Sequence, residues 1–170
     1  MKFKTSALLL VLLLGFSACR KDRDGDTNNE EPLTGIAAFL NGEFEVTRVD
    51  YNGSFDPPIG PNIPLSGTGD STQGYYLFDA RAKNLDYDVF TRMEIDLLGQ
   101  TFNIPVRIDG SGTVDYVSET RFTVDDPDIG LVTYDINNKT SNSLRATTRY
   151  ETDTLAGELD MLLDVYLTKK

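Results

Sequence analysis

Apolar and polar residues alternate with a period of two along most of the chain after residue 35. Successive side chains of an extended strand point to opposite faces, so each alternating row predicts a strand with one apolar face. The row from Phe44 to Tyr51 slips by one position, which indicates a β-bulge. The apolar positions of the rows are Phe44, Val46, Val49, Tyr51, Tyr87, Val89, Met93, Ile95, Leu97, Phe102, Ile104, Val106, Ile108, Val114, Tyr116, Phe122, Val124, Leu144, Ala146, Tyr150, Leu159, Met161, Leu163, Val165 and Leu167.

Segments rich in Gly, Asn and Asp separate the rows and predict turns. Strands at this spacing predict an all-β fold, either a barrel or a sandwich. We favour a closed, antiparallel up-and-down β-barrel of about eight strands, because closure leaves no exposed strand edge; a β-sandwich is the alternative. Residues 36–40 alone suggest a helical turn. The predicted turns are Asn52-Gly53, Leu98-Gly99-Gln100, Asp109-Gly110-Ser111-Gly112, Asp125-Asp126-Pro127-Asp128 and Asn137-Asn138-Lys139-Thr140.

Two segments that contain proline interrupt this pattern. Pro105 lies inside a row, and proline cannot donate to a strand ladder, so we expect a bulge or a locally unpaired position there. Residues 55–73 contain four prolines and several glycines, which predicts a long irregular loop. Such a loop at an open barrel end can cover the entrance, so it is a candidate gate.

The composition excludes several classes of function. The chain has no histidine, no tryptophan and one cysteine. The lack of histidine excludes Ser-His-Asp and Cys-His nucleophiles and His-ligated zinc, and we expect no catalytic residue, no metal and no cofactor. With 27 acidic against 16 basic side chains, the formal net charge is −11. An acidic domain repels phosphate backbones, so nucleic acid is not expected as a partner.

The first 18 residues have the order of a secretion signal. Lys2 and Lys4 precede an apolar run that ends at Phe16, and small residues follow. Cys19 stands directly after Phe-Ser-Ala, and this site resembles the lipobox of bacterial lipoproteins, although Phe16 replaces the usual Leu. The resemblance implies a signal peptide over residues 1–18. It also implies that acyl chains such as palmitate on Cys19 attach the protein to a membrane.

Residues 19–34 carry charged residues and Asn with almost nothing apolar to bury, which predicts a flexible tether that spans about 20 Å. Asp22, Asp24 and Asp26 have the spacing of the start of a calcium loop, but Thr27 replaces the glycine such a loop needs, so we favour a solvated linker. Removal of residues 1–18 takes away two of the 16 lysines and arginines. The 14 that remain face 27 acidic residues, which gives a formal charge of −13.

The segment Leu40-Asn41-Gly42-Glu43-Phe44 is similar to the opening of lipocalin-like (calycin) barrels. In that family a Gly-x-Trp motif begins the first strand, and its aromatic ring plugs the barrel floor; Phe44 takes that position here. The basic end of the chain, Lys169 and Lys170, resembles the end of the family's last strand. The resemblance implies a lipocalin-like β-barrel domain over residues 35–170 that packs solid or holds one small apolar molecule.

The inward rows of such a barrel supply candidate lining residues for a ligand. A solid apolar core is the competing interpretation, because eight-stranded barrels adopt both forms. Tyrosines favour a cavity slightly, since a buried phenol needs a hydrogen-bond partner. The candidate ligand-binding residues are Tyr75 (or Tyr76), Tyr87, Val89, Met93, Phe102, Ile104, Tyr116, Tyr150 and Met161.

Acidic residues form two further candidate sites. Asp86, Asp88, Glu94 and Asp96 lie on or beside one predicted strand, and paired carboxylates are the machinery of a glycosidase. The same alternation describes the solvated face of a half-buried strand with Arg92 as a neutralising partner, and we favour that interpretation. The acidic turn 125–128 has oxygen ligands for calcium, but acidic proline turns also occur without an ion.

These observations predict a lipid-anchored protein of the cell envelope, at the outer membrane and facing the periplasm or the outside. The expected role is binding of a small, largely apolar ligand in the barrel. An accessory or structural subunit that contacts an envelope protein is the second expectation, and a carboxylate-dependent hydrolase is the third. Charged residues in most strands argue against a barrel that spans the membrane.

Overall fold

The computed structural model describes residues 31–97, 99–154 and 157–170. Residues 33–170 form one compact unit, which contains every helix and strand described. The predicted signal peptide, Cys19 and the tether up to residue 30 lie outside the described residues. Among the described residues, no helix combines the length and the apolar character needed to cross a membrane.

A short helix, α2 (Gly35–Leu40), precedes the strands and confirms the predicted helical turn. The Thr34 side chain makes no capping hydrogen bond. Instead, the Ile36 N–H donates to the carboxylate of Glu119, 3.2 Å away, which satisfies one of the free amides of the first turn. Ile36 and Leu40 are buried, so one face of the helix packs against the core.

Nine strands follow, and every pairing between them is antiparallel. From β3 to β9 each strand pairs with the next in sequence, and β1 pairs with both β3 and β9. The strands are β1 (Gly42–Asp56), β2 (Ile63–Thr68), β3 (Asp70–Asp79), β4 (Asn84–Leu97), β5 (Gln100–Ser118), β6 (Arg121–Asp126), β7 (Gly130–Lys139), β8 (Ser143–Thr154) and β9 (Gly157–Lys169).

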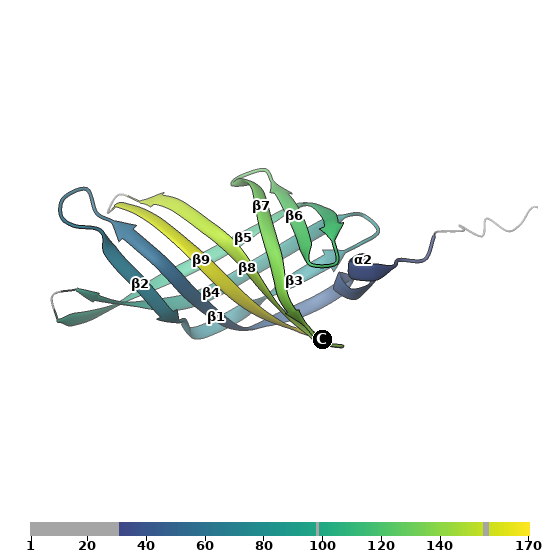
Figure 1. Cartoon of the computed structure of the whole chain (residues 1–170), viewed down its shortest axis with the longest axis horizontal. Helices are drawn as coiled ribbons and strands as arrows, with labels where there is room; N and C mark the ends of the chain where they lie inside the picture. The colour runs from purple at the N-terminus through teal and green to yellow at the C-terminus, as the bar shows by residue number, and fades with distance from the viewer. Residues whose placement is uncertain (1–30, 98, 155–156) are drawn as a thin grey trace, which may run out of the picture. The chain divides into compact units, whose positions relative to one another are not determined.

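The β1–β9 pairing closes the sheet into a ring (Figure 1). Eight strands, β1 and β3 to β9, make up this ring, which confirms the predicted up-and-down barrel over the alternative sandwich. The register of β1 against β9 shifts between Val46 and Arg48, at the slip in the first alternating row. The predicted β-bulge is therefore confirmed.

The predicted loop over residues 55–73 is wrong, because most of this segment is strand. β1 continues to Asp56, and β2 pairs with residues 50–55 of β1 before β3 pairs with residues 42–45. The Gly69 N–H, between β2 and β3, donates to the Val49 carbonyl at 2.8 Å. β2 and β3 thus form one interrupted strand along β1, and only residues 57–62 connect β1 to β2. A long gate over the barrel entrance does not exist.

Two predicted turns, Asn52-Gly53 and Asp109–Gly112, lie inside strands β1 and β5. Gly53 and Gly110, one in each segment, allow neighbouring groups to come close to the backbone because glycine has no Cβ. A Cβ on Gly53 would meet the Asp160 carbonyl of β9, and a Cβ on Gly110 would meet the Asp126 carboxylate and the Tyr87 hydroxyl. These glycines therefore serve packing inside the barrel, and the chain does not reverse at them.

Aromatic rings fill a large part of the barrel interior. Adjacent centroids lie 4.7 to 6.2 Å apart, in stacked, tilted and edge-on pairs that are favourable for aromatic rings. Six of the seven rings are buried, and Phe39 is partly exposed. The seven are Phe39, Phe44, Tyr76, Phe78, Tyr87, Phe122 and Tyr134.

Phe44 lies at the end of the barrel that α2 adjoins and is fully buried. The Lys169 ammonium group at the end of β9 lies 5.6 Å from the centre of the Phe44 ring and 5.9 Å from that of Phe39. It also donates a hydrogen bond to the Phe39 carbonyl at 3.0 Å. A cation over two ring faces at this distance stabilises the packing of helix, first strand and last strand.

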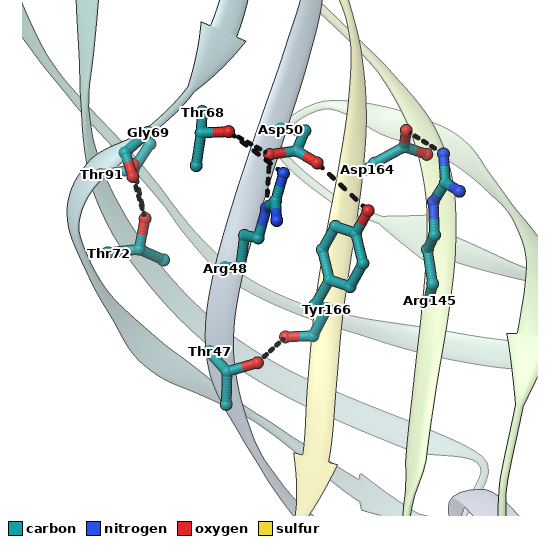
Figure 2. A network of polar contacts seen from close by, with 10 residues as sticks. All are labelled: Thr47, Arg48, Asp50, Thr68, Gly69, Thr72, Thr91, Arg145, Asp164 and Tyr166. Carbon is teal, nitrogen blue, oxygen red and sulfur yellow. Dashed lines mark hydrogen bonds and ion pairs between the residues drawn. The ribbon is translucent and has the colours of Figure 1, made fainter.

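A polar network covers the outer face of β1, β8 and β9 (Figure 2). Asp50 accepts hydrogen bonds from Arg48 at 2.7 Å, Thr68 at 2.7 Å and the Tyr166 hydroxyl at 3.1 Å. The guanidinium groups of Arg48 and Arg145 lie 5.2 and 5.6 Å from the centre of the Tyr166 ring. The network therefore ties neighbouring strands together at the surface, where each contact contributes little alone.

Candidate functional site

The ladder between β7 and β8 ends half-way along the strands. Its last pair is Tyr134 with Thr148. Beyond this pair, residues 130–133 of β7 pair only with β6, and residues 149–154 of β8 pair only with β9. Figure 1 shows β7 and β8 diverging from their paired ends near the C-terminus. The barrel wall is therefore split on this side.

The opposite border of the split is β5. The ladder between β5 and β6 begins only at Thr113, so residues 100–112 of β5 pair with β4 alone. Pro105 lies in this segment and pairs with Arg92 without a shift in register. The predicted bulge at Pro105 does not form, and Pro105 is unpaired only on the side of β5 that faces away from β4.

A groove of about 410 Å³ with both apolar and polar lining residues lies in the split, and we name it the β7–β8 groove. Its walls come from β5, from the turn after β6, and from the diverging parts of β7 and β8. Leu131 and Ile129 are 71% and 56% exposed, which is high for large aliphatic side chains. The lining residues are Ile108, Ile129, Leu131, Val132, Thr133, Tyr134, Arg149, Tyr150 and Glu151.

The charged residues at the groove already have partners. The Arg149 guanidinium forms two hydrogen bonds with Asp160, at 2.9 and 2.7 Å, and an ion pair with Glu151 at 2.7 Å. The Tyr134 phenol is buried, and burial raises its pKa to about 12 although its hydrogen bond with Tyr76 opposes the shift. The inner wall is therefore neutral at physiological pH.

A buried carboxylate supports the turn that carries Ile129. Asp126 Oδ2 accepts a hydrogen bond from the Tyr87 hydroxyl at 2.6 Å, and Oδ1 accepts from the N–H groups of Asp128 and Ile129. Burial alone would raise the pKa of Asp126, but the Tyr87 hydroxyl and the two amides outweigh burial and hold the pKa below its usual value. Asp126 therefore stays ionised, and its carboxylate holds the turn in place and does not serve as an ion ligand.

The acidic turn does not gather the ligands of a metal. In the part of the chain that the structure describes, no group of three or more Asp, Glu, His or Cys side chains is placed to hold a metal ion. Asp126, at the centre of the turn, uses both oxygens for the contacts with Tyr87, Asp128 and Ile129. The calcium interpretation of residues 125–128 has no support in this geometry.

The predicted lining residues are scattered over the barrel. Tyr87, Val89, Met93 and Met161 are buried in the core, and Tyr116 is partly buried against it. Tyr150 alone of the nine lines the β7–β8 groove. The inward positions Phe102 and Ile104 remain 45% and 38% exposed because β5 has no partner on that side.

The choice of Tyr75 as a lining residue is wrong. The buried positions of β3 are Tyr76 and Phe78, and alternation puts Tyr75 and Leu77 on the outer face. Tyr75 contributes to a shallow, acidic depression of about 450 Å³ together with Asp86, Asp88 and Asp109. The register of β3 shifts between Asp70 and Gln73, which no local sequence signal indicated.

Eight of the nine groove residues were absent from the predicted set: Ile108, Ile129, Leu131, Val132, Thr133, Tyr134, Arg149 and Glu151. The row Val132, Tyr134 and Ile136 alternates between two predicted turns, so the period-two pattern was sufficient to find β7. Nothing in the sequence indicates that the β7–β8 ladder stops at Tyr134. The groove follows from that interruption.

The acidic row on β4 matches a solvated strand face. Asp88 forms two hydrogen bonds with Arg107, at 3.0 and 2.8 Å, and Arg107 also lies 3.7 Å from Asp109. The predicted neutralising residue, Arg92, instead donates to the Ser71 hydroxyl at 3.4 Å. Because Asp88 is held by an arginine on the neighbouring strand, it is not positioned as half of a catalytic carboxylate pair.

No family model matches the chain, and no curated protein matches it. Among solved structures, bovine odorant-binding protein with a selenium-containing odorant is 14% identical, covers 77% of this chain and 73% of that chain, and has a TM-score of 0.36. A dog lipocalin allergen is 14% identical, with coverages of 76% and 72% and a TM-score of 0.37. The bovine protein with undecanal is 13% identical, with coverages of 83% and 77% and a TM-score of 0.36. Similarity at this level assigns neither a family nor a ligand.

Proposed function

We propose that this protein binds a small, largely apolar molecule in the β7–β8 groove while an acylated Cys19 holds it at the cell envelope. The observation that carries the binding role is the groove itself: a concavity of about 410 Å³ opened by the early end of one strand ladder, with aliphatic and aromatic side chains beside polar ones in its lining. A volume of this size accommodates one small organic molecule.

The exposed apolar side chains near the groove support this role. Ile129 and Leu131 border the groove, and Phe102 and Ile104 extend the apolar surface along the free edge of β5. Large apolar side chains gathered around a concavity mark binding sites more often than isolated ones do. A ligand in the groove removes part of this surface from water, which contributes about 25 cal/mol for each Å² buried.

The envelope part of the proposal rests on the sequence of residues 1–34. The charged start, the apolar run and Cys19 form one export and acylation signal, and the hydrophilic segment that follows supplies a tether. A Cys19→Ser substitution in the full chain is expected to move the protein from the membrane fraction to the soluble fraction. Retention of the variant in the membrane fraction would contradict the anchor, and the binding proposal is independent of that result.

The binding role is tested with pyrene, a rigid apolar molecule whose emission reports the polarity around it. The whole chain from residue 19 onward, with Cys19→Ser so that no acyl chain competes, is titrated with pyrene. We expect saturable binding that Leu131→Ser and Ile129→Ser weaken by about tenfold, since each removes apolar contact area. Leu162→Ser is the matched control, because Leu162 is 54% exposed on β9 and does not line the groove.

Two outcomes would refute the binding role. The first is the absence of saturable pyrene binding by the folded chain. The second is an equal loss of affinity in the Leu162→Ser control. One observation favours an accessory role for the protein in that case: seven aromatic rings pack against one another in the domain, and six of them are buried. A well-packed core is a stable platform for a protein partner.

A further inference from the structure

Thr148 is not itself a lining residue of the β7–β8 groove, but it adjoins two residues that are, and its buried hydroxyl has no hydrogen-bond partner. The residue is 7% exposed, and its Oγ1 contacts no donor or acceptor. It forms the last pair of the β7–β8 ladder with Tyr134. Tyr150 is the next residue on the same face of β8, and both tyrosines line the groove.

Two further neighbours of Thr148 are apolar. Leu163 pairs with it on β9, and Ala146 precedes it on the same face of β8; both are buried. Its sequence neighbour differs: Thr147 faces outward and donates its hydroxyl to Asp164. Buried hydroxyl groups are rarely left without a hydrogen-bond partner, so the unpaired hydroxyl of Thr148 requires an explanation.

The charges around the groove restrict what can satisfy this hydroxyl. Asp126 is ionised and accepts the N–H of Ile129, a lining residue, and Glu151 lies at the rim. The whole chain carries a formal charge of −11. Arg149, the cation at the groove, is already paired with Asp160 and Glu151. A carboxylate would therefore enter a negative field with no free cation among the lining residues to receive it.

We propose that the groove binds a neutral amphiphile, a molecule with an apolar body and one uncharged hydrogen-bonding end group, and that Thr148 Oγ1 binds this end group. A hydroxyl both donates and accepts, so an alcohol or a carbonyl satisfies it equally well. The inference rests on the proposed function and specifies its ligand class. It selects medium-chain alcohols and aldehydes over fatty acids.

The experiment compares 1-decanol with decanoate at pH 8 in displacement of pyrene, in the whole chain with Cys19→Ser. We expect 1-decanol to bind at least tenfold more tightly than decanoate. Thr148→Val keeps the size of the side chain and removes its hydroxyl. The substitution should weaken the binding of 1-decanol by about three- to tenfold, which is the effect of one neutral hydrogen bond. Pyrene has no hydrogen-bonding group, so the substitution should weaken pyrene binding less than it weakens the binding of 1-decanol.

Two further variants separate a hydroxyl contact from a change of shape. Thr148→Ser retains the hydroxyl and should keep the preference for 1-decanol. Thr123→Val makes the same chemical change on the outer face of β6 and should alter neither affinity. Circular dichroism checks that each variant is folded.

The outcomes distinguish this inference from the proposed function. If pyrene binds but Thr148→Val leaves the affinity for 1-decanol unchanged, the role of Thr148 is wrong and the groove remains a binding site. If decanoate binds as tightly as 1-decanol, the preference for a neutral end group is wrong. If the folded chain does not bind pyrene at all, the proposed function itself fails.

Discussion

The Tyr87 hydroxyl donates a 2.6 Å hydrogen bond to Asp126 Oδ2, which joins β4 to the turn after β6. Neither residue was expected to contact the other from the sequence, where 39 positions separate them. Gly110 makes the contact possible, because any Cβ there would occupy the space of both groups. The pair fixes the turn that presents Ile129 to the groove.

Loss of the Tyr87 hydroxyl should therefore destabilise the barrel. Tyr87→Phe removes the donor but leaves Asp126 ionised and buried, and we expect a loss of about 2 kcal/mol in the free energy of unfolding, as for a hydrogen bond to a charged group. Urea denaturation measures the change. Tyr75→Phe is the control, because Tyr75 lies on the outer face, and it should change stability by less than about 0.5 kcal/mol. Equal effects of the two substitutions would contradict the role of the pair.

Stability should fall in acid and stay constant near neutrality. Hydrogen bonds hold the pKa values of Asp126, Asp50 and Asp164 below their usual range although burial opposes the shift. A lowered folded-state pKa stabilises the protein above the unfolded value, about 4, and this contribution disappears as the pH falls through the folded pKa. Thermal unfolding between pH 2.5 and 8 should show this decline, and the chain has no histidine that would add a step near pH 6.5.

The same argument makes a substitution at Asp126 diagnostic. Asp126→Asn cannot ionise, so the variant should be less stable than the parent at pH 7 and should lose less stability between pH 5 and 2.5. The comparison of the two unfolding curves isolates this one carboxyl group. A variant whose acid dependence equals that of the parent would mean that the carboxylates on the outer face, and not Asp126, control acid unfolding.

The outer network should depend on the Tyr166 ring as much as on its hydroxyl. Tyr166→Phe loses the 3.1 Å hydrogen bond to Asp50 and keeps the ring between Arg48 and Arg145. We expect it to cost about 1 kcal/mol, and Tyr166→Leu to cost about 1 kcal/mol more because both cation–π contacts are lost. The free energies of unfolding are measured in urea, because urea is uncharged and, unlike guanidinium chloride, does not screen these charges. Equal stability of the two variants would mean that the cations contribute nothing.

Thr148→Val should stabilise the unliganded protein. The substitution removes a buried hydroxyl that has no partner and keeps the volume of the side chain. We expect a gain of about 1 kcal/mol in the free energy of unfolding, measured without ligand. A loss of stability of similar size would indicate that a water molecule satisfies the hydroxyl in the free protein.

The alternating rows predicted the architecture well because burial of one face imposes a period of two on each strand. The bulge after Val46 was also visible, since an inserted residue shifts the apolar positions. Gly53 and Gly110 misled the prediction, because a glycine that permits close approach has the same sequence signature as a glycine in a turn. The Pro-rich segment misled it in the same way: Pro64 pairs with Ser54 in a short strand on the edge of β1.

The candidate site was harder to predict than the fold. Tyr150 was identified, but the choice between Tyr75 and Tyr76 was wrong, because no alternating row was recognised over β3 that would assign each tyrosine to a face. The position of the groove depends on where the β7–β8 ladder stops. That point is set by the pairing of four neighbouring strands, and no single segment of sequence encodes it.

Because the β7–β8 ladder ends at Tyr134 and Thr148, the proposed binding of a ligand should also affect the dynamics of these two strands. A molecule bound there would contact both β7 and β8 in the part of the barrel where these two strands share no backbone hydrogen bonds. It would therefore connect the two strands across the gap in the barrel wall. Occupancy should then slow amide hydrogen exchange in residues 130–133 and 149–153 more than elsewhere in the sheet. If the groove binds a ligand as proposed, the ligand would enter through the side of the barrel between β7 and β8.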